Sequence, residues 1–125
     1  MVIGIGVDSV EIRRVQKSCE SSHFVERIFT EEEIRQFDKK KIRAASDFAG
    51  KEAVVKIFGT GFSGCEPSEI EILRNSQGAP YVRLSGRARR IAEELGITDI
   101  QISITNTSEL ATAFAIGCSG KEGAV

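Results

Sequence analysis

Hydrophobic and polar positions near the N-terminus predict a strand followed by a short helix. Residues 2–7 (VIGIGV) are apolar apart from two glycines, a pattern typical of a buried strand that another segment can approach closely. Asp8 interrupts this run, so we expect it at the C-terminal end of the strand. Ile12 and Val15 then stand three residues apart among basic residues, which predicts an amphipathic helix with a basic face.

Two further helices are predicted in the first half of the chain. Thr30 and Glu33 have the spacing of a capping box, so a helix is expected over residues 31–37. Residues 44–58 repeat apolar positions at helical intervals, and Gly59 follows directly as a residue that can end the helix. A glycine-rich loop comes next.

The second half of the chain predicts two strand pairs with one helix between them. Ser85 can cap this helix and Gly96 can end it. Alternating apolar positions and intervening turn residues place the four strands at residues 69–73, 80–84, 100–104 and 111–116.

The predicted order of elements is β-α-α-α-β-β-α-β-β, which is typical of an α+β fold with antiparallel strands and packed helices. A chain of 125 residues has the size of one domain. We expect this domain to cover residues 1–118, with residues 119–125 as a frayed tail.

Charge and cysteine content narrow the classes of function. The formal net charge of −1 argues against a general attraction to nucleic acid or to an anionic membrane. The three cysteines are widely spaced and form no CxxC pair, so neither a disulfide framework nor a zinc site is indicated. The N-terminal apolar run is too short for a secretory signal, and no run approaches the ~20 apolar residues of a membrane span. We therefore expect a cytoplasmic protein.

Asp8 is the first residue with candidate chemistry. A carboxylate at the end of a strand often points into a cleft, where it can bind a hard cation. The alternative is a helix N-cap, and position alone favours that alternative.

A second candidate site lies in the helix over residues 44–58 and the loop after it. Glu52 and Lys56 are four residues apart, so they share a helix face, either as a surface ion pair or as ligands of a metal and a phosphate. The backbone N–H groups of Gly59, Thr60 and Gly61 can surround a phosphate in a nest arrangement. The spacing does not match a P-loop, because Cys65 follows Gly64.

The third candidate is the polar segment at residues 103–107 (SITNT). Its hydroxyls and amide can bind phosphate oxygens, although the same residues are also common at the end of a polar hairpin. Taken alone, the segment favours the hairpin interpretation.

Five segments together resemble the holo-[acyl-carrier-protein] synthases, a family of 4′-phosphopantetheinyl transferases. The central one, residues 48–61 (FAGKEAVVKIFGTG), is the most specific. The order and spacing of the five hold along nearly the whole chain, at residues 4–14, 24–33, 48–61, 75–81 and 103–107.

The resemblance implies a reaction and a set of roles. Such an enzyme moves 4′-phosphopantetheine from coenzyme A to a serine of apo-acyl carrier protein, releases 3′,5′-ADP and supports fatty acid biosynthesis. It implies that Asp8 and Glu52 hold Mg²⁺, which suits one or two carboxylates and phosphate oxygens. Lys56 would neutralise the pyrophosphate, and Glu52 or a water that it orients would deprotonate the serine, with Lys51 as the less favoured base.

The resemblance also implies partners. It predicts a homotrimer with active sites between subunits, and the size of the chain agrees because so small a domain can hardly enclose coenzyme A alone. No nucleic acid or membrane partner is expected. Coenzyme A would contact Gly59, Thr60, Gly61, Asn106 and Thr107 besides Lys56, and acidic carrier protein would dock on Arg13, Arg14 and Lys17.

Two departures from the family pattern leave a competing interpretation open. Asn106 stands where the family usually has histidine, and Asp47 stands where it tends to have arginine. An asparagine binds a phosphate less strongly than a cationic histidine. A carrier-protein or coenzyme A binding module without catalysis is therefore one rival, and a nucleic-acid binder using residues 39–43 is a weaker second one.

Overall fold

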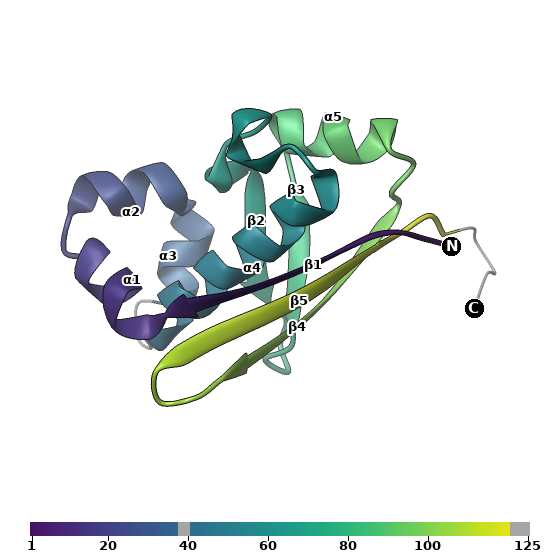
Figure 1. Cartoon of the computed structure of the whole chain (residues 1–125). Coiled ribbons are helices and arrows are strands. Elements are labelled where there is room, and N and C mark those ends of the chain that lie inside the picture. Colours follow the sequence, from purple (N-terminus) through teal and green to yellow (C-terminus); the bar gives the residue numbers. More distant parts are fainter. Residues whose placement is uncertain (38–40, 121–125) are drawn as a thin grey trace.

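The larger sheet of the computed structural model contains three antiparallel strands in the order β1-β5-β4 (Figure 1). Its register pairs Asp8 with Ala113 and Ala113 with Ile104. The structure describes residues 1–37 and 41–120. The strands are β1 (Val2–Glu11), β4 (Asp99–Asn106) and β5 (Leu110–Cys118).

In the described residues, a hairpin and five helices complete the fold. In Figure 1, α4 lies between the hairpin and the larger sheet, with α1, α2 and α3 at one end of the molecule. The hairpin consists of β2 (Ile70–Arg74) and β3 (Pro80–Leu84). The helices are α1 (Ile12–Ser18), α2 (Ser22–Ile28), α3 (Glu31–Phe37), α4 (Ile42–Phe58) and α5 (Gly86–Glu94), with short 3₁₀ turns η1 (Gly61–Ser63) and η2 (Pro67–Glu69).

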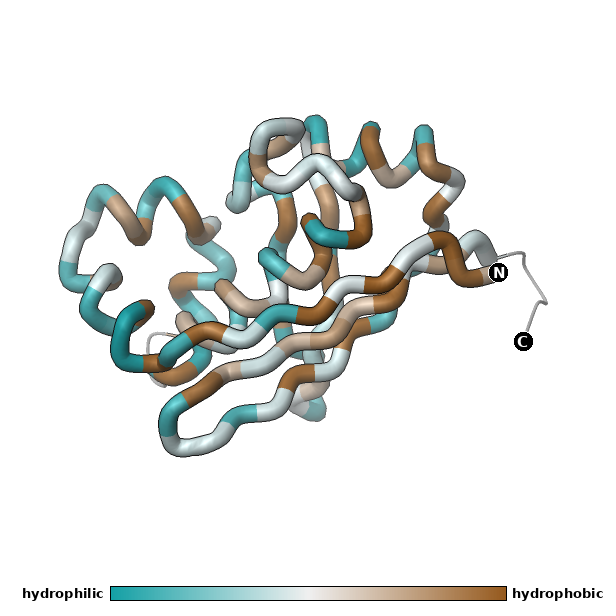
Figure 2. Tube along the Cα trace, in the orientation of Figure 1, coloured by the Kyte–Doolittle hydropathy of each residue, from teal (hydrophilic) through white to brown (hydrophobic). Residues whose placement is uncertain are grey.

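The first strand differs from its prediction in length and in burial. β1 continues to Glu11, so Asp8 lies inside the strand rather than at its end or at a helix N-cap. The strand is not buried on both faces, because Ile5 is 61% exposed and Val7 is 53% exposed. The inner face carries Gly6 instead, and Figure 2 shows white and brown segments alternating along this part of β1.

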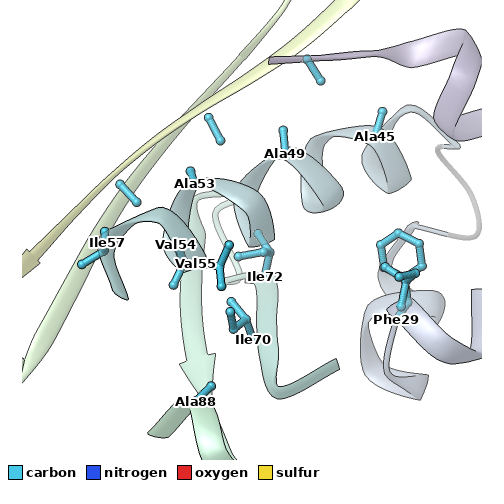
Figure 3. Close-up of a cluster of buried hydrophobic side chains, with 14 of the residues drawn as sticks. Phe29, Ala45, Ala49, Ala53, Val54, Val55, Ile57, Ile70, Ile72 and Ala88 are labelled. Atoms are coloured by element: carbon cyan, nitrogen blue, oxygen red, sulfur yellow. The ribbon is translucent and has the colours of Figure 1, made fainter. Parts of the chain in front are cut away.

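Small residues bring α4 close to the larger sheet. A Cβ added to Gly6 would lie 1.9 Å from the backbone oxygen of Ala53, so only glycine fits there. Ala49 and Ala53 lie on the edge of α4 that faces the sheet (Figure 3), and both are fully buried. A Cβ on Gly50 would meet both Ile72 of β2 and Ile102 of β4, which shows that α4 packs against both sheets.

The helix predictions hold in most cases. Thr30 and Glu33 form the expected capping box, with Glu33 N–H donating to Thr30 Oγ1 at 3.3 Å and Thr30 N–H to Glu33 Oε1 at 3.0 Å. The long helix begins at Ile42, two residues earlier than predicted, and ends at Gly59, whose φ of 77° suits glycine.

Two helix details were predicted wrongly. Sequence reasoning missed α2, whose seven residues bury only Ile28 and so carry no helical period; its signal was Ser21, which accepts from the N–H of Phe24 at 3.3 Å. Ser85 precedes α5 without a capping hydrogen bond from its side chain, and Glu69 accepts from the N–H of Arg87 at 3.1 Å instead.

The two ends of the described chain lie side by side, at the end of the larger sheet where β1 begins and β5 finishes. The N–H of Ser119 donates to the Met1 carbonyl at 2.8 Å, and the N–H of Gly120 contacts Thr98 Oγ1. Residues 121–125 of the predicted tail lie outside the described residues. So do residues 38–40, and therefore Lys39 and Lys40 of the basic segment considered for nucleic acid.

Asp47 faces the hairpin from α4. Its carboxylate accepts from Arg74 Nη1 at 2.8 Å, and its residue is 1% exposed. Burial raises the pKa of Asp47 to about 7; the Arg74 charge opposes this, the nearby Glu33 charge adds to it, and Lys51 also opposes it. Asp47, one of the two departures from the family pattern, therefore has its charged partner on β2.

We expect Asp47→Asn to reduce the pH dependence of stability. The folded pKa of about 7 exceeds the ordinary ~3.9 of an unfolded aspartate, so between these values the folded chain binds a proton that the unfolded chain releases. The free energy of unfolding therefore falls as pH rises through this window. Denaturant unfolding at pH 5 and pH 8 should show a fall that is smaller in the variant by on the order of 2 kcal/mol. Equal falls in both proteins would contradict the assignment.

Candidate active site

Asp8 and Lys56 form an ion pair between the first strand and α4. Lys56 Nζ lies 3.1 Å from Asp8 Oδ1 and donates to the Val7 carbonyl at 2.9 Å. The Lys56 side chain is 53% exposed and that of Asp8 is 20% exposed. An ammonium group half in water can be released to another anion, so this pair is not locked into the core.

Glu52 completes the cluster from the preceding turn of α4. Burial raises the pKa of the half-buried Glu52 carboxyl, the negative charge of Asp8 raises it further, and Lys56 opposes both effects. Glu52 also shares a helix face with Lys56, whose ammonium contacts Asp8, so the two carboxylates lie on the same side of α4. Repulsion between them favours a bound cation, which is the electrostatic requirement of a metal site.

The donor set suits Mg²⁺. Two carboxylates supply hard oxygen ligands, and Mg²⁺ usually takes its remaining ligands from water and from substrate phosphates. Among residues 1–37 and 41–120, no group of three or more His, Cys, Asp or Glu side chains is placed to hold a metal. Asp8 and Glu52 would therefore provide only part of a coordination sphere, and substrate oxygens would complete it.

The geometry distinguishes two interpretations of Glu52 and Lys56. A surface ion pair along the helix was the common alternative, but Lys56 reaches across to Asp8 on β1. Folding thus brings together the three residues that the family resemblance selected. Asp8 is 44 residues before Glu52 and 48 residues before Lys56 in the sequence. This supports a shared site for Asp8, Glu52 and Lys56.

The glycine loop starts one turn after Lys56. Gly59 and Gly61 have positive φ angles of 77° and 60°, while Thr60 between them is right-handed at φ −106° and ψ −10°. Alternation of left- and right-handed residues turns successive N–H groups to one side, as in a nest that binds anions. A Cβ added at either glycine would touch nothing within 4 Å, so the loop has open space around it.

The polar segment at the end of β4 is arranged as a hairpin end. Thr107 Oγ1 accepts from the N–H groups of Glu109 and Leu110, at 3.2 and 2.9 Å, and thereby closes the turn to β5. The Asn106 amide donates to Ser46 Oγ at 3.0 Å. Asn106 is on β4, two strands from Asp8 on β1, which alone separates the strands by roughly 10 Å. Within one chain, Asn106 and Thr107 do not join the carboxylate cluster.

Lys51 is excluded as a base. Its residue is 0% exposed, and its ammonium donates to Glu33 Oε1, the Pro67 carbonyl and the Ile70 carbonyl. Because all three N–H donors are used inside the protein, no lone pair or proton of Lys51 can reach a substrate.

A hollow beside the cluster was not predicted from the sequence. It has a volume of about 370 Å³ and begins directly after Asp8, at Ser9 and Val10. The rings of Phe24 and Phe48 form its apolar wall with centroids 6.2 Å apart, and Arg14 lies at its rim. Both phenylalanines stand in the segments that resemble the family, and this was the only signal that could have identified them. A neighbouring basic depression includes Arg13, Arg14 and Lys17.

Comparisons with known proteins identify the family of this chain. A family model described as "4'-phosphopantetheinyl transferase superfamily" matches residues 4–115. A holo-[acyl-carrier-protein] synthase of Lachnoclostridium phytofermentans is 50% identical over 117 residues, which are 94% of this chain and 96% of the relative. The corresponding protein of Alkaliphilus metalliredigens is 45% identical over 120 residues, 93% of this chain and 98% of the relative.

Solved structures match the fold over nearly its full length. The acyl carrier protein synthase of Plasmodium yoelii with ADP bound has a TM-score of 0.87 at 30% identity, covering 97% of this chain and 98% of that one. The Helicobacter pylori holo-[acyl-carrier-protein] synthase in complex with coenzyme A has a TM-score of 0.79 at 27% identity, covering 91% and 99%. This chain therefore belongs to the holo-[acyl-carrier-protein] synthases of the 4′-phosphopantetheinyl transferase superfamily.

Proposed function

We propose that this chain transfers 4′-phosphopantetheine from coenzyme A to a serine of apo-acyl carrier protein and releases 3′,5′-ADP. The observation that carries the proposal is the cluster of Asp8, Glu52 and Lys56 beside an open glycine loop, in a chain of this family. The product would supply holo-acyl carrier protein to fatty acid biosynthesis.

A mass measurement tests this function directly. The chain is incubated with apo-acyl carrier protein, coenzyme A and Mg²⁺, and the carrier is weighed by mass spectrometry. We expect the carrier to gain one phosphopantetheine. Binding of both substrates without a gain in mass would support the binding module instead.

Asp8 and Glu52 would hold Mg²⁺ together with oxygens of the coenzyme A pyrophosphate. When bound, the metal supplies positive charge that stabilises the negative charge developing on the phosphate oxygens. Lys56 would exchange its contact with Asp8 for a pyrophosphate oxygen, and the N–H groups of residues 59–61 would bind the same anion. Glu52, or a water it orients, would accept the serine proton; its raised pKa brings it closer to neutral pH, where a base is most effective.

The basic face of α1 is the proposed dock for the acidic carrier protein. Arg14 is 84% exposed in its side chain, and its nearest acidic partner, Glu11, is 3.9 Å away. Such weakly paired charges remain available to an incoming protein. Because the hollow behind Arg14 begins next to Asp8, a carrier docked here would place its serine near the cluster.

Arg14→Glu should raise the KM for carrier protein roughly 10-fold, because a reversed charge at an exposed site repels an acidic partner. The KM for coenzyme A should change much less, and the effect should shrink at high salt as screening increases. Steady-state kinetics at two salt concentrations measure both. Arg89→Glu on α5 is the matched control, since its side chain is also exposed, at 69%. Equal effects of Arg14→Glu on both substrates would contradict docking at α1.

A homotrimer is the proposed assembly. The outer face of the larger sheet exposes a row of large apolar side chains, which is unusual for a surface that faces only water. Interfacial sites would also let Asn106 and Thr107 of one subunit contact coenzyme A at the cluster of another. Light scattering of the purified chain tests the assembly, and a monomeric mass at assay concentration would contradict it. The exposed residues are Ile3, Ile5, Val7, Leu110 and Phe114.

We place the protein in the cytoplasm. In the part of the chain that the structure describes, no helix is long and apolar enough to cross a membrane. Cys19, Cys65 and Cys118 are all free thiols, which suits a reducing compartment.

A further inference from the structure

Lys51 joins three segments at the back of the proposed site. Its Nζ donates to Glu33 Oε1 of α3 at 2.8 Å, to the Pro67 carbonyl of η2 at 2.9 Å and to the Ile70 carbonyl at the start of β2 at 2.7 Å. The ammonium also lies 5.5 Å from the centroid of the Phe29 ring. A completely buried ammonium with every donor satisfied has one defined position.

Glu33 is held as firmly as the lysine it binds. Its Oε1 also accepts from the Thr30 N–H at 3.0 Å, and its Oε2 accepts from the Ile72 N–H at 2.9 Å. Thr30 Oγ1 in turn donates to Glu71 Oε2 at 2.6 Å. The acceptor of the Lys51 ammonium is thus fixed to α3 and to β2 independently of α4.

Lys51 and Glu52 are consecutive residues of α4, so their side chains leave the helix about 100° apart. Lys51 points toward α3 and β2, whereas Glu52 shares a helix face with Lys56, whose ammonium contacts Asp8 of β1. Rotation of α4 about its axis would therefore move Glu52 relative to Asp8, and the bonds of Lys51 oppose that rotation.

The same lysine ties the far end of the glycine loop to α4. The loop leaves α4 at Gly59 and returns to the body of the protein at Pro67, whose carbonyl binds the Lys51 ammonium. Lys51 lies about two turns before the end of α4, so its bond fixes the returning end of the loop to the helix from which the loop departs. The nest residues 59–61 lie within this closed segment.

We propose that Lys51 is a positioning residue for the transfer reaction, in that its buried bonds to Glu33, Pro67 and Ile70 hold Glu52 and Lys56 on the side of α4 that meets Asp8 and hold the loop at residues 59–61 in its anion-binding conformation. This rests on the proposed function of the Asp8 and Glu52 cluster. Lys51 touches no substrate, and its effect passes through the orientation of α4.

The experiment compares the full chain with the variants Lys51→Met and Glu33→Gln/Lys51→Met. The single variant leaves the Glu33 carboxylate buried without its partner and can fail to fold, whereas the double variant removes both charges and retains an amide at position 33. Asp47→Asn is the control, because it neutralises another buried ion pair of α4 that faces away from the site. If circular dichroism shows that the double variant is unfolded, the single variant Glu33→Gln tests the proposal with the same measurements.

We expect the double variant to fold and to lose about 10- to 100-fold in kcat, since a displacement of about 1 Å in a catalytic group can cost that much. Its KM for carrier protein should stay within about 3-fold, because the α1 surface is untouched. Hydrogen exchange of the amides at residues 59–66 should accelerate. The control should keep kcat within about 2-fold of the unaltered chain, even if its thermal stability falls as much as that of the double variant.

A kcat within about 2-fold in the folded double variant, with unchanged exchange at residues 59–66, would overturn the proposal and leave Lys51 a stabilising residue only. An equal loss of kcat in Asp47→Asn would also overturn it, because general destabilisation would then suffice. If the unaltered chain transfers nothing, the proposed function fails, whereas the exchange measurement still decides whether Lys51 orders the loop.

Discussion

Glu52→Gln and Asp8→Asn should each lower the transfer rate about 10²- to 10³-fold at saturating substrates. Both variants keep the size of the side chain and remove the negative charge that would hold Mg²⁺, so charge stabilisation in the transition state is lost. Glu52→Gln also removes the proposed proton acceptor. The measurement is kcat from the mass of the carrier protein over time, repeated across Mg²⁺ concentrations, with circular dichroism as the test of folding.

The control for these variants is Glu93→Gln. Glu93 is an exposed carboxylate on α5 paired with Arg89 at 3.4 Å, and neutralising it should leave kcat unchanged. If Asp8→Asn or Glu52→Gln transfers phosphopantetheine at a near-normal rate at every Mg²⁺ concentration, the metal assignment is wrong. The two carboxylates then serve the fold only.

Lys56→Met should raise the KM for coenzyme A roughly 10- to 100-fold and lower kcat as well. The ammonium now binds Asp8 and the Val7 carbonyl, and a hydrogen bond between charged groups contributes about 1.5–3 kcal/mol. Methionine retains an unbranched apolar stem and lacks the ammonium, so the change tests the charge of Lys56 together with its hydrogen bonds. Isothermal titration with coenzyme A and steady-state kinetics separate binding from turnover.

Lys56→Arg provides a second comparison at this position. Arginine keeps the charge but presents a planar fork in place of a compact ammonium, so coenzyme A binding should recover in part. Unchanged kinetics in Lys56→Met would reduce Lys56 to an ion-pair partner of Asp8. Normal binding with slow turnover would instead mean that the Lys56 charge acts on the phosphate oxygens of the departing 3′,5′-ADP only in the transition state.

Local signals were sufficient for most helices and strands. The capping box of Thr30 and Glu33, the glycine at position 59 and the turn between residues 74 and 80 act over a few residues, and each reappears in the structure. The α+β class follows from the order of these elements. Helix α2 was not predicted, because its seven residues bury only Ile28 and therefore show no helical period of apolar positions.

The candidate site could be selected from the sequence but not assembled from it. Resemblance to a family pointed to Asp8, Glu52 and Lys56, because order and spacing of motifs survive where single residues are uninformative. The contact between Lys56 and Asp8 depends on the packing of α4 against β1, which Gly6 permits by leaving room for the Ala53 backbone. No local pattern encodes that approach.

Two lysines of one motif show most clearly what the sequence determines and what only the tertiary structure decides. By itself the sequence determined the helix that carries Lys51 and Lys56 and its glycine end, because these depend on neighbours along the chain. Helical pattern alone could not tell which of the two lysines is buried and which is exposed. Tertiary structure decided this, since Lys51 is enclosed by α3, η2 and β2 whereas Lys56 lies half in water beside Asp8. The physical reason is that burial and charge environment come from segments distant in sequence, and these exist only when the chain is folded.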